Sequence, residues 1–170
     1  WMNLASGEFK VNECTAEQLE TEVHRIAPAE IITADSFKLS LNYDVAYSKT
    51  ADWHFELSAA QEKLCDHYGV DNLSAFGIDE LSNATIAAGA LLSYVENTQK
   101  RNLSHIKPLQ LDDIQEYLIL DPVTRKNLEI TQTISGETSP TLFSLLDHCH
   151  TPMGSRLLRR FLHHPLRHNA

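Results

Sequence analysis

The chain has 170 residues, of which 42% are hydrophobic and 22% are charged, and its formal net charge is −9. This length fits one ordinary domain, or one domain and part of a second, with enough apolar side chains for a core. No apolar run approaches the ~20 residues that span a bilayer, and the first residues lack the basic and apolar regions of a secretion signal, so we expect a cytoplasmic protein.

The charges divide the chain into two parts. Residues 1–100 contain 16 acidic and 6 basic residues, a net of −10, whereas residues 101–170 contain 7 acidic and 8 basic residues, a net of +1. Because the acidic first part repels phosphate backbones, we expect its partners to be proteins. The three cysteines, Cys14, Cys65 and Cys149, are too few and too widely spaced for a disulfide framework or a Cys-x-x-Cys zinc pair.

The beginning of the chain predicts a strand–helix–strand unit. Residues 1–11 are typical of two short strands joined by a tight turn. A helix over 15–28 begins at a capping box of Thr15 and Gln18, and residues 29–34 predict a buried strand. A strand, a helix and a strand of these lengths indicate a βαβ crossover in an α/β domain.

Two further helices are predicted before residue 100. Residues 52–57 alternate well enough to predict an edge strand, and Ser58 then predicts the cap of a helix that ends at Gly69. The next helix, over roughly 83–99, is apolar around most of its circumference, so we expect it to be buried against the sheet. Gly89 would permit a close approach there.

The polar segment 98–113 is broken by Pro108 and marks the change in charge, and we take this segment as the domain boundary. The remainder predicts a mostly helical segment in which Asp121 and Thr151 act as N-caps, each followed by proline at the first helical position. Helices are predicted over 121–132, 141–149 and 151–164.

The last of these helices carries an apolar stripe beside several arginines. The stripe consists of Leu157, Leu158, Phe161 and Leu162. The arginines are Arg156, Arg159 and Arg160. Without aromatic stacking partners, three arginines indicate a solvated helix face more strongly than a nucleic-acid contact, although an autonomous nucleic-acid-binding module stays open as an alternative.

Metal and nucleotide sites receive little support from the sequence. The histidines that could suggest zinc are His148, His150, His163, His164 and His168, with Cys149 among them, but their spacing matches no zinc motif. A metal-dependent nuclease, the other alternative, would need the carboxylates of Asp35, Asp52 and Glu56 to converge on two ions. No glycine is followed by another five residues later, so a Walker-type phosphate loop is absent from the sequence.

Two motifs carry a resemblance to a known family. LDPVTRKNLEI (120–130) and TPMGSRLLRRFLHHPL (151–166), in this order and spacing, resemble the MutS family of bacterial DNA mismatch repair proteins. The resemblance covers essentially the whole chain. It implies a ribonuclease H-like α/β connector domain over 1–105, followed by the start of the helical core, or lever, domain over 106–170.

The resemblance also implies partners. For an intact family member it implies a homodimer that recognises mispaired DNA with ATP and Mg²⁺ and recruits MutL. For this chain it implies a connector without catalytic, cofactor or metal site, because the aromatic-x-Glu mismatch reader and the ATPase lie in other domains. The MutL docking face maps to Gln61, Glu62 and Lys63, where Glu62 and Lys63 depart from the family's glutamine-rich pattern.

The resemblance finally suggests a role for the apolar stripe. In the family this helix leads into long lever helices, which we expect to be missing from this chain. We therefore expect Leu157, Leu158, Phe161 and Leu162 to find another surface, and we favour self-association with a second copy.

Overall fold

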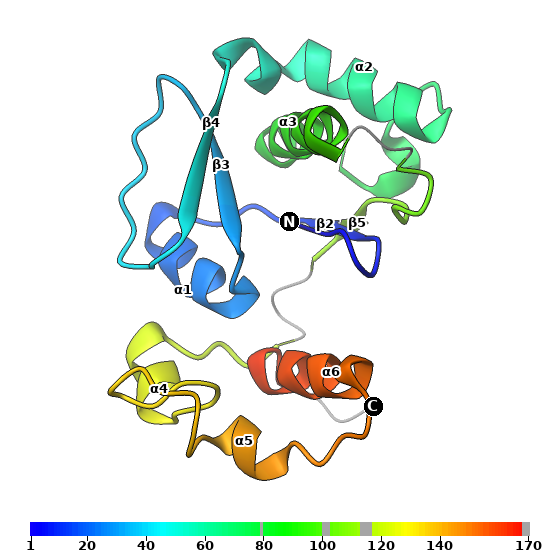
Figure 1. Cartoon of the computed structure of the whole chain (residues 1–170). Coiled ribbons are helices and arrows are strands. Elements are labelled where there is room, and N and C mark those ends of the chain that lie inside the picture. Colours follow the sequence, from blue (N-terminus) through cyan, green and yellow to red (C-terminus); the bar gives the residue numbers. More distant parts are fainter. Residues whose placement is uncertain (79, 100–102, 113–116, 168–170) are drawn as a thin grey trace. The chain divides into compact units, whose positions relative to one another are not determined.

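The computed structural model describes residues 1–78, 80–99, 103–112 and 117–167 (Figure 1). The chain divides into two compact units: unit 1 comprises residues 1–15 and 28–112, and unit 2 comprises residues 16–27 and 113–170. The predicted mixture of α and β structure is confirmed, whereas the ribonuclease H-like topology and the boundary at residue 105 stay predictions. Among the described residues, no helix combines the length and the apolar character needed to cross a bilayer.

The strands of unit 1 form two small sheets (Figure 1). β1 (Met2–Asn3) pairs antiparallel with β2 (Glu8–Val11), and β2 pairs in parallel with β5 (Gln110–Leu111). β3 (Glu30–Ala34) and β4 (Ala46–Thr50) form a separate parallel pair. The hairpin predicted for the first residues and a strand within 29–34 are therefore confirmed, although only Thr33 of this strand is buried.

The turn between β1 and β2 requires glycine. Gly7 has a φ of +70°, in the left-handed region that side chains disfavour. A Cβ atom at this position would also lie 2.2 Å from the carbonyl oxygen of His105. Glycine thus lets the segment that precedes β5 run directly against the hairpin.

The predicted βαβ crossover is wrong. α1 (Ala16–Ile26) does follow β2, but the parallel neighbour of β2 is β5, and β3 pairs with β4 instead. α1 belongs to unit 2, where it contacts α4 (Pro122–Asn127). The reason is that helical periodicity defines which side chains a helix buries, but not which surface receives them.

The edge strand predicted over 52–57 is also wrong. These residues form a 3₁₀ turn, η1 (Asp52–Phe55), and the carboxylate of its first residue accepts a hydrogen bond of 3.1 Å from the backbone N–H of Ser36. The next helix begins at residue 57, so the predicted cap Ser58 lies inside its first turn. Its predicted end at Gly69, with a φ of +64°, is confirmed.

Two helices pack side by side in unit 1 (Figure 1). They are α2 (Leu57–Tyr68) and α3 (Ser82–Gln99), with a second 3₁₀ turn, η2 (Ser74–Phe76), between them along the chain. A Cβ on Gly89 would come within 2.5 Å of the Cα of Ala60, so only glycine allows this distance between the helix backbones. The close approach expected at Gly89 is confirmed, against α2.

An apolar core unites these elements of unit 1. Its buried residues come from β2, α2, α3 and the loops that connect them. They are Phe9, Val11, Leu64, Leu73, Ile78, Ala84, Ala88, Leu92, Val95, Leu103, Ile106 and Leu109. Phe9, Leu64, Ile78 and Leu92 are the largest fully buried side chains of the described residues.

The helices of the second half begin where the sequence predicts. α4, α5 (Leu142–Leu146) and α6 (Pro152–His163) each start after a residue whose side chain accepts a hydrogen bond from the backbone of the first turn. These caps are Asp121, Thr141 and Thr151. α4 and α5 are shorter than expected, while α6 has nearly its predicted length.

Candidate functional sites

The three residues mapped as a docking face, Gln61, Glu62 and Lys63, point in different directions. Successive residues of an α-helix are rotated by about 100°, so three in a row cannot share one narrow face. Gln61 and Glu62 are exposed. The ammonium group of Lys63 instead forms an ion pair with the carboxylate of Glu96 on α3. Lys63 thus links two helices of unit 1.

His67 faces the same carboxylate one turn further along α2. Its Nδ1 atom lies 3.7 Å from Oε1 of Glu96. Burial lowers the pKa of the His67 imidazole, and the charge of Lys63 lowers it further, although the carboxylate of Glu96 acts in the opposite direction. The neutral form of His67 is favoured, so Lys63 is the main ionic partner of Glu96.

The outward face of α2 is acidic. Ser58, Glu62 and Asp66 are spaced by four residues, lie on one side of the helix and are all exposed, with Gln61 beside them. With Lys63 directed towards α3, no basic residue of α2 lies on this side. We call these four residues the outward face of α2.

A small hollow lies next to this face. It has a volume of about 190 Å³ and is lined by Gln61, Cys65, Asp71, Asn72, Leu73, Ile78 and Thr85. Leu73 and Ile78 are buried, while Asp71 and Asn72 are exposed. Sites for small molecules measure roughly 300–1,000 Å³, so this hollow could accept a single side chain of a partner rather than a cofactor.

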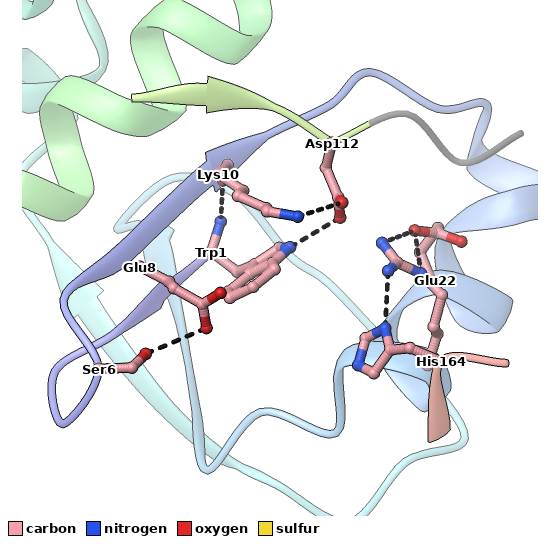
Figure 2. A network of polar contacts seen from close by, with 8 residues as sticks. Trp1, Ser6, Glu8, Lys10, Glu22, Asp112 and His164 are labelled. Carbon is pink, nitrogen blue, oxygen red and sulfur yellow. Dashed lines mark hydrogen bonds and ion pairs between the residues drawn. The ribbon is translucent and has the colours of Figure 1, made fainter. Parts of the chain in front are cut away.

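Unit 2 contains a second set of polar residues, which we call the arginine–histidine cluster. It consists of Glu22, Arg25, Arg125, His163 and His164. Arg25 is 3% exposed, and its Nε and Nη2 atoms donate hydrogen bonds of 2.9 and 2.7 Å to Oε2 of Glu22. Its Nη1 atom lies 3.0 Å from Nδ1 of His164 (Figure 2). Because arginine can only donate, Nδ1 of His164 is the acceptor and carries no proton.

The other arginine of the cluster holds His163. Nη2 of Arg125 donates to the carbonyl oxygen of His163 at 3.0 Å, and its Nη1 lies 3.5 Å from Nδ1 of the ring. Burial, assisted by the charges of Arg125 and Arg159, lowers the pKa of His163 to about 4. The ring is therefore neutral near pH 7, with Nδ1 facing the arginine and Nε2 placed 3.2 Å from the hydroxyl of Thr131.

These contacts give the adjacent histidines a structural role. Each ring is held by a different buried arginine, which leaves no pair of free nitrogens for a metal. Among the described residues, no group of three or more His, Cys, Asp or Glu could hold a metal ion. This includes Asp35, Asp52 and Glu56, the carboxylates considered for a nuclease, whereas His168 lies outside the described residues.

The apolar stripe of α6 divides into two parts. Leu158 and Leu162 are half-buried within unit 2, whereas Leu157 and Phe161 are 49% and 62% exposed. Met153, which the sequence reasoning left out, is 78% exposed and precedes Leu157 by one turn. Met153, Leu157 and Phe161 thus form one exposed row along α6, which we call the outer row.

The sequence reasoning also missed the buried polar groups. In unit 1, Asp112 is 2% exposed and accepts hydrogen bonds from Nε1 of Trp1 at 2.9 Å and Nζ of Lys10 at 3.4 Å (Figure 2). In unit 2, Glu22 and Arg25 lie three residues apart on the same helix face as the apolar Val23 and Ile26. Opposite charges at this spacing on an apolar face were the available indication of a buried pair.

Comparison with known families covers both halves of the chain. Residues 1–107 match the family described as MutS domain II, and residues 123–170 match MutS domain III. The first match contains all elements of unit 1 up to residue 107 and also α1. By sequence, therefore, α1 falls in the match to domain II, whereas by its contacts it belongs to unit 2 with the residues that match domain III.

Proposed function

The chain belongs to the MutS family of DNA mismatch repair proteins, and on this premise we propose that it is a non-catalytic connector which presents the outward face of α2 to a MutL-like protein. One observation carries the proposal: this face is exposed and acidic, and the helix beneath it is fixed by its packing on α3. A rigid element presents its side chains to a partner at a small entropic cost.

The charges of this face suggest the chemistry of the partner surface. Glu62 and Asp66 are exposed on α2, and Asp71 is exposed at the rim of the neighbouring hollow. A partner surface with lysine or arginine would complement them, and one such side chain could place its aliphatic part against Leu73 and Ile78. Association through exposed charges is sensitive to salt.

Charge reversal at Glu62 tests the proposal. We expect Glu62→Lys to weaken binding of a MutL-like protein by about tenfold at ~0.1 M salt, as measured by biolayer interferometry, because it places a like charge in the interface. Circular dichroism should show an unchanged fold, since exposed helix substitutions cost under about 0.5 kcal/mol.

Two matched variants serve as controls. Glu17→Lys makes the same change at an exposed position of α1, in unit 2, and should leave the affinity unchanged. Lys63→Gln removes a charge that is already paired with Glu96, so its effect should be smaller than that of Glu62→Lys. Equal affinities of Glu62→Lys and the unaltered chain would contradict the docking face, as would equal losses in Glu62→Lys and Glu17→Lys.

The connector role also predicts which activities the chain lacks. We propose that it neither hydrolyses ATP nor selects mismatched DNA, and that ATP, Mg²⁺ and the mispaired bases are bound by other domains of a homodimeric family member. Fluorescence anisotropy with a G·T duplex and its matched counterpart at ~0.1 M salt measures the second activity. Micromolar binding that prefers the mismatch would show that the chain is itself a DNA-reading module.

A further inference from the structure

We propose that α1 is a coupling element: the arginine–histidine cluster fixes it to the residues that match MutS domain III, so it moves with unit 2, while both of its ends continue covalently into unit 1. The chain enters α1 from unit 1 at residues 15–16 and returns to unit 1 at residues 27–28. This proposal concerns a different part of the chain from the docking face and does not depend on it.

The anchor is a single guanidinium group with several directed contacts. Glu22 and Arg25 are 5% and 3% exposed, and two nitrogens of Arg25 donate to the same oxygen of Glu22, which orients the remaining Nη1 atom towards His164. The same guanidinium lies 5.2 Å from the ring centroid of Tyr117. A planar fork held in this way fixes both the position and the rotation of α1.

The residues that receive this anchor are themselves fixed. His164 follows the last residue of α6, and its ring lies edge-on to Tyr117 with centroids 5.6 Å apart. The backbone N–H of Leu118 donates to the carbonyl oxygen of Pro165 at 2.8 Å, and Tyr117 forms a β-bridge with Leu166. The end of α6 and the segment 117–118 therefore form one support on which Arg25 rests.

The exit from α1 is short and stiff. Ala27 has a φ of +49°, a left-handed conformation that non-glycine residues disfavour. Its N–H donates to the carbonyl oxygen of Val23 at 2.8 Å, and Pro28 follows with its own φ restricted. Only residues 27–29 separate α1 from β3. Because this linker is short, a displacement of α1 should also displace the start of β3.

Hydrogen exchange of the full chain, read by mass spectrometry, can distinguish the unit to which α1 belongs. His164→Ala removes the acceptor of Arg25 in unit 2, and Leu64→Ala opens a cavity in the core of unit 1. We expect peptides from α1 to exchange about tenfold faster or more in His164→Ala, and at an unchanged rate in Leu64→Ala, whereas peptides from α2 and α3 should respond in the opposite way. His150→Ala, at an exposed histidine of unit 2, should change neither.

Each other pattern overturns the proposal. If the exchange rate of α1 rises in Leu64→Ala alone, unit 1 holds the helix. If it rises equally in both variants, the chain opens as one body. If it rises in neither variant, the cluster does not hold the helix. Complete unfolding of unit 2 in His164→Ala does not hide the answer, because α1 should then exchange with α6 while α2 and α3 stay protected. Arg25→Lys, which keeps the charge but loses the planar guanidinium group with its several donors, should give the same pattern in weaker form.

Discussion

The two units bury apolar and polar side chains in different proportions. Unit 1 has a large apolar core, with Phe9, Leu64, Ile78 and Leu92 as its largest fully buried side chains, although it also buries Thr33, Thr85 and Asp112. Unit 2 buries Val23 and Ile130 but also four polar or charged residues, Glu22, Arg25, Arg125 and Thr141. At the same time it exposes large apolar side chains such as Leu145, Met153 and Phe161, which are 71%, 78% and 62% exposed.

This difference has consequences for how each unit responds to substitution. Apolar burial is non-directional and roughly proportional to area, so unit 1 depends on many side chains that each contribute a part. Charge-assisted hydrogen bonds are directional, and removing one partner leaves the other buried without compensation. Unit 2 should therefore depend strongly on a few residues of the arginine–histidine cluster.

The largest expected difference between the two units comes from the same leucine-to-alanine change made once in each unit. Leu92→Ala removes a fully buried side chain of α3 and should lower the free energy of unfolding of unit 1 by about 2–5 kcal/mol. Leu157→Ala makes the same change at a position of α6 that is 49% exposed and should cost unit 2 less than about 1 kcal/mol. Urea unfolding, monitored in each unit by hydrogen exchange, measures both free energies of unfolding. Similar losses of stability in the two variants would show that the two cores are built alike.

Two helical glycines give the next largest difference. A methyl group at Gly89 would collide with the backbone of Ala60, so Gly89→Ala should destabilise unit 1 by about 1–3 kcal/mol. At Gly154 the nearest atom would be the Cβ of Cys149 at 3.1 Å, so the backbone of this exposed residue outside the helices would need to move by only a few tenths of an ångström. Gly154→Ala should thus be neutral or stabilise α6 by up to about 1 kcal/mol, through its higher helix propensity. Thermal unfolding of both variants decides; a stabilising Gly89→Ala would contradict the close packing of α2 on α3.

An effect of a different kind is expected from acid. The pKa of His163 is about 4 in the folded protein against 6.5 ordinarily, so between these values the unfolded chain binds a proton that the folded chain does not. The stability of unit 2 should therefore fall as the pH is lowered from about 6.5 towards 4, and this contribution should be constant above that window. His163→Asn should flatten the dependence, and His150→Asn should not. A slope that survives in His163→Asn would assign the acid sensitivity to another group.

The smallest effect on stability is expected from the outer row of α6, where we propose the contact with a second copy of the chain. Leu157→Ser combined with Phe161→Ser should change unfolding by less than about 1 kcal/mol, because both side chains are already in contact with water. The same variant should lower the sedimentation coefficient at high protein concentration if the row joins two copies. If the unaltered chain is monomeric at high concentration and sediments like the variant, it does not self-associate through this row.

The sequence predicted local features well and long-range ones poorly. The caps Asp121 and Thr151, the helix end at Gly69 and the close approach at Gly89 depend on steric and hydrogen-bonding preferences within one turn, or on the absence of a side chain. The surface that receives α1 includes Tyr117 and His164, which are far from Arg25 in the sequence, and no local pattern specifies it. Residues 52–57 alternate in character, yet a contact with Ser36 and the start of α2 decide their conformation.

The proposed docking surface shows the same limit. Helix α2 could be predicted, and the exposure of Glu62 follows from its position opposite the apolar side. The ion pair of Lys63 with Glu96 depends on the distance between α2 and α3, which Gly89 and Ala60 set. Three neighbouring residues could therefore be named from the sequence, but not the different directions in which they point.

The central claim, that a buried polar network holds unit 2 whereas apolar packing holds unit 1, is tested most directly by one double-mutant cycle in each unit. In unit 2 the cycle combines Glu22→Met and Arg25→Met; in unit 1 it combines Lys63→Met and Glu96→Met, a pair whose side chains are 33% and 32% exposed. We predict a coupling energy of about 2 kcal/mol or more for the first pair, with much of the loss recovered in the double variant, and less than about 1 kcal/mol for the second. Additive losses at Glu22 and Arg25, or equal coupling in the two units, would contradict the account.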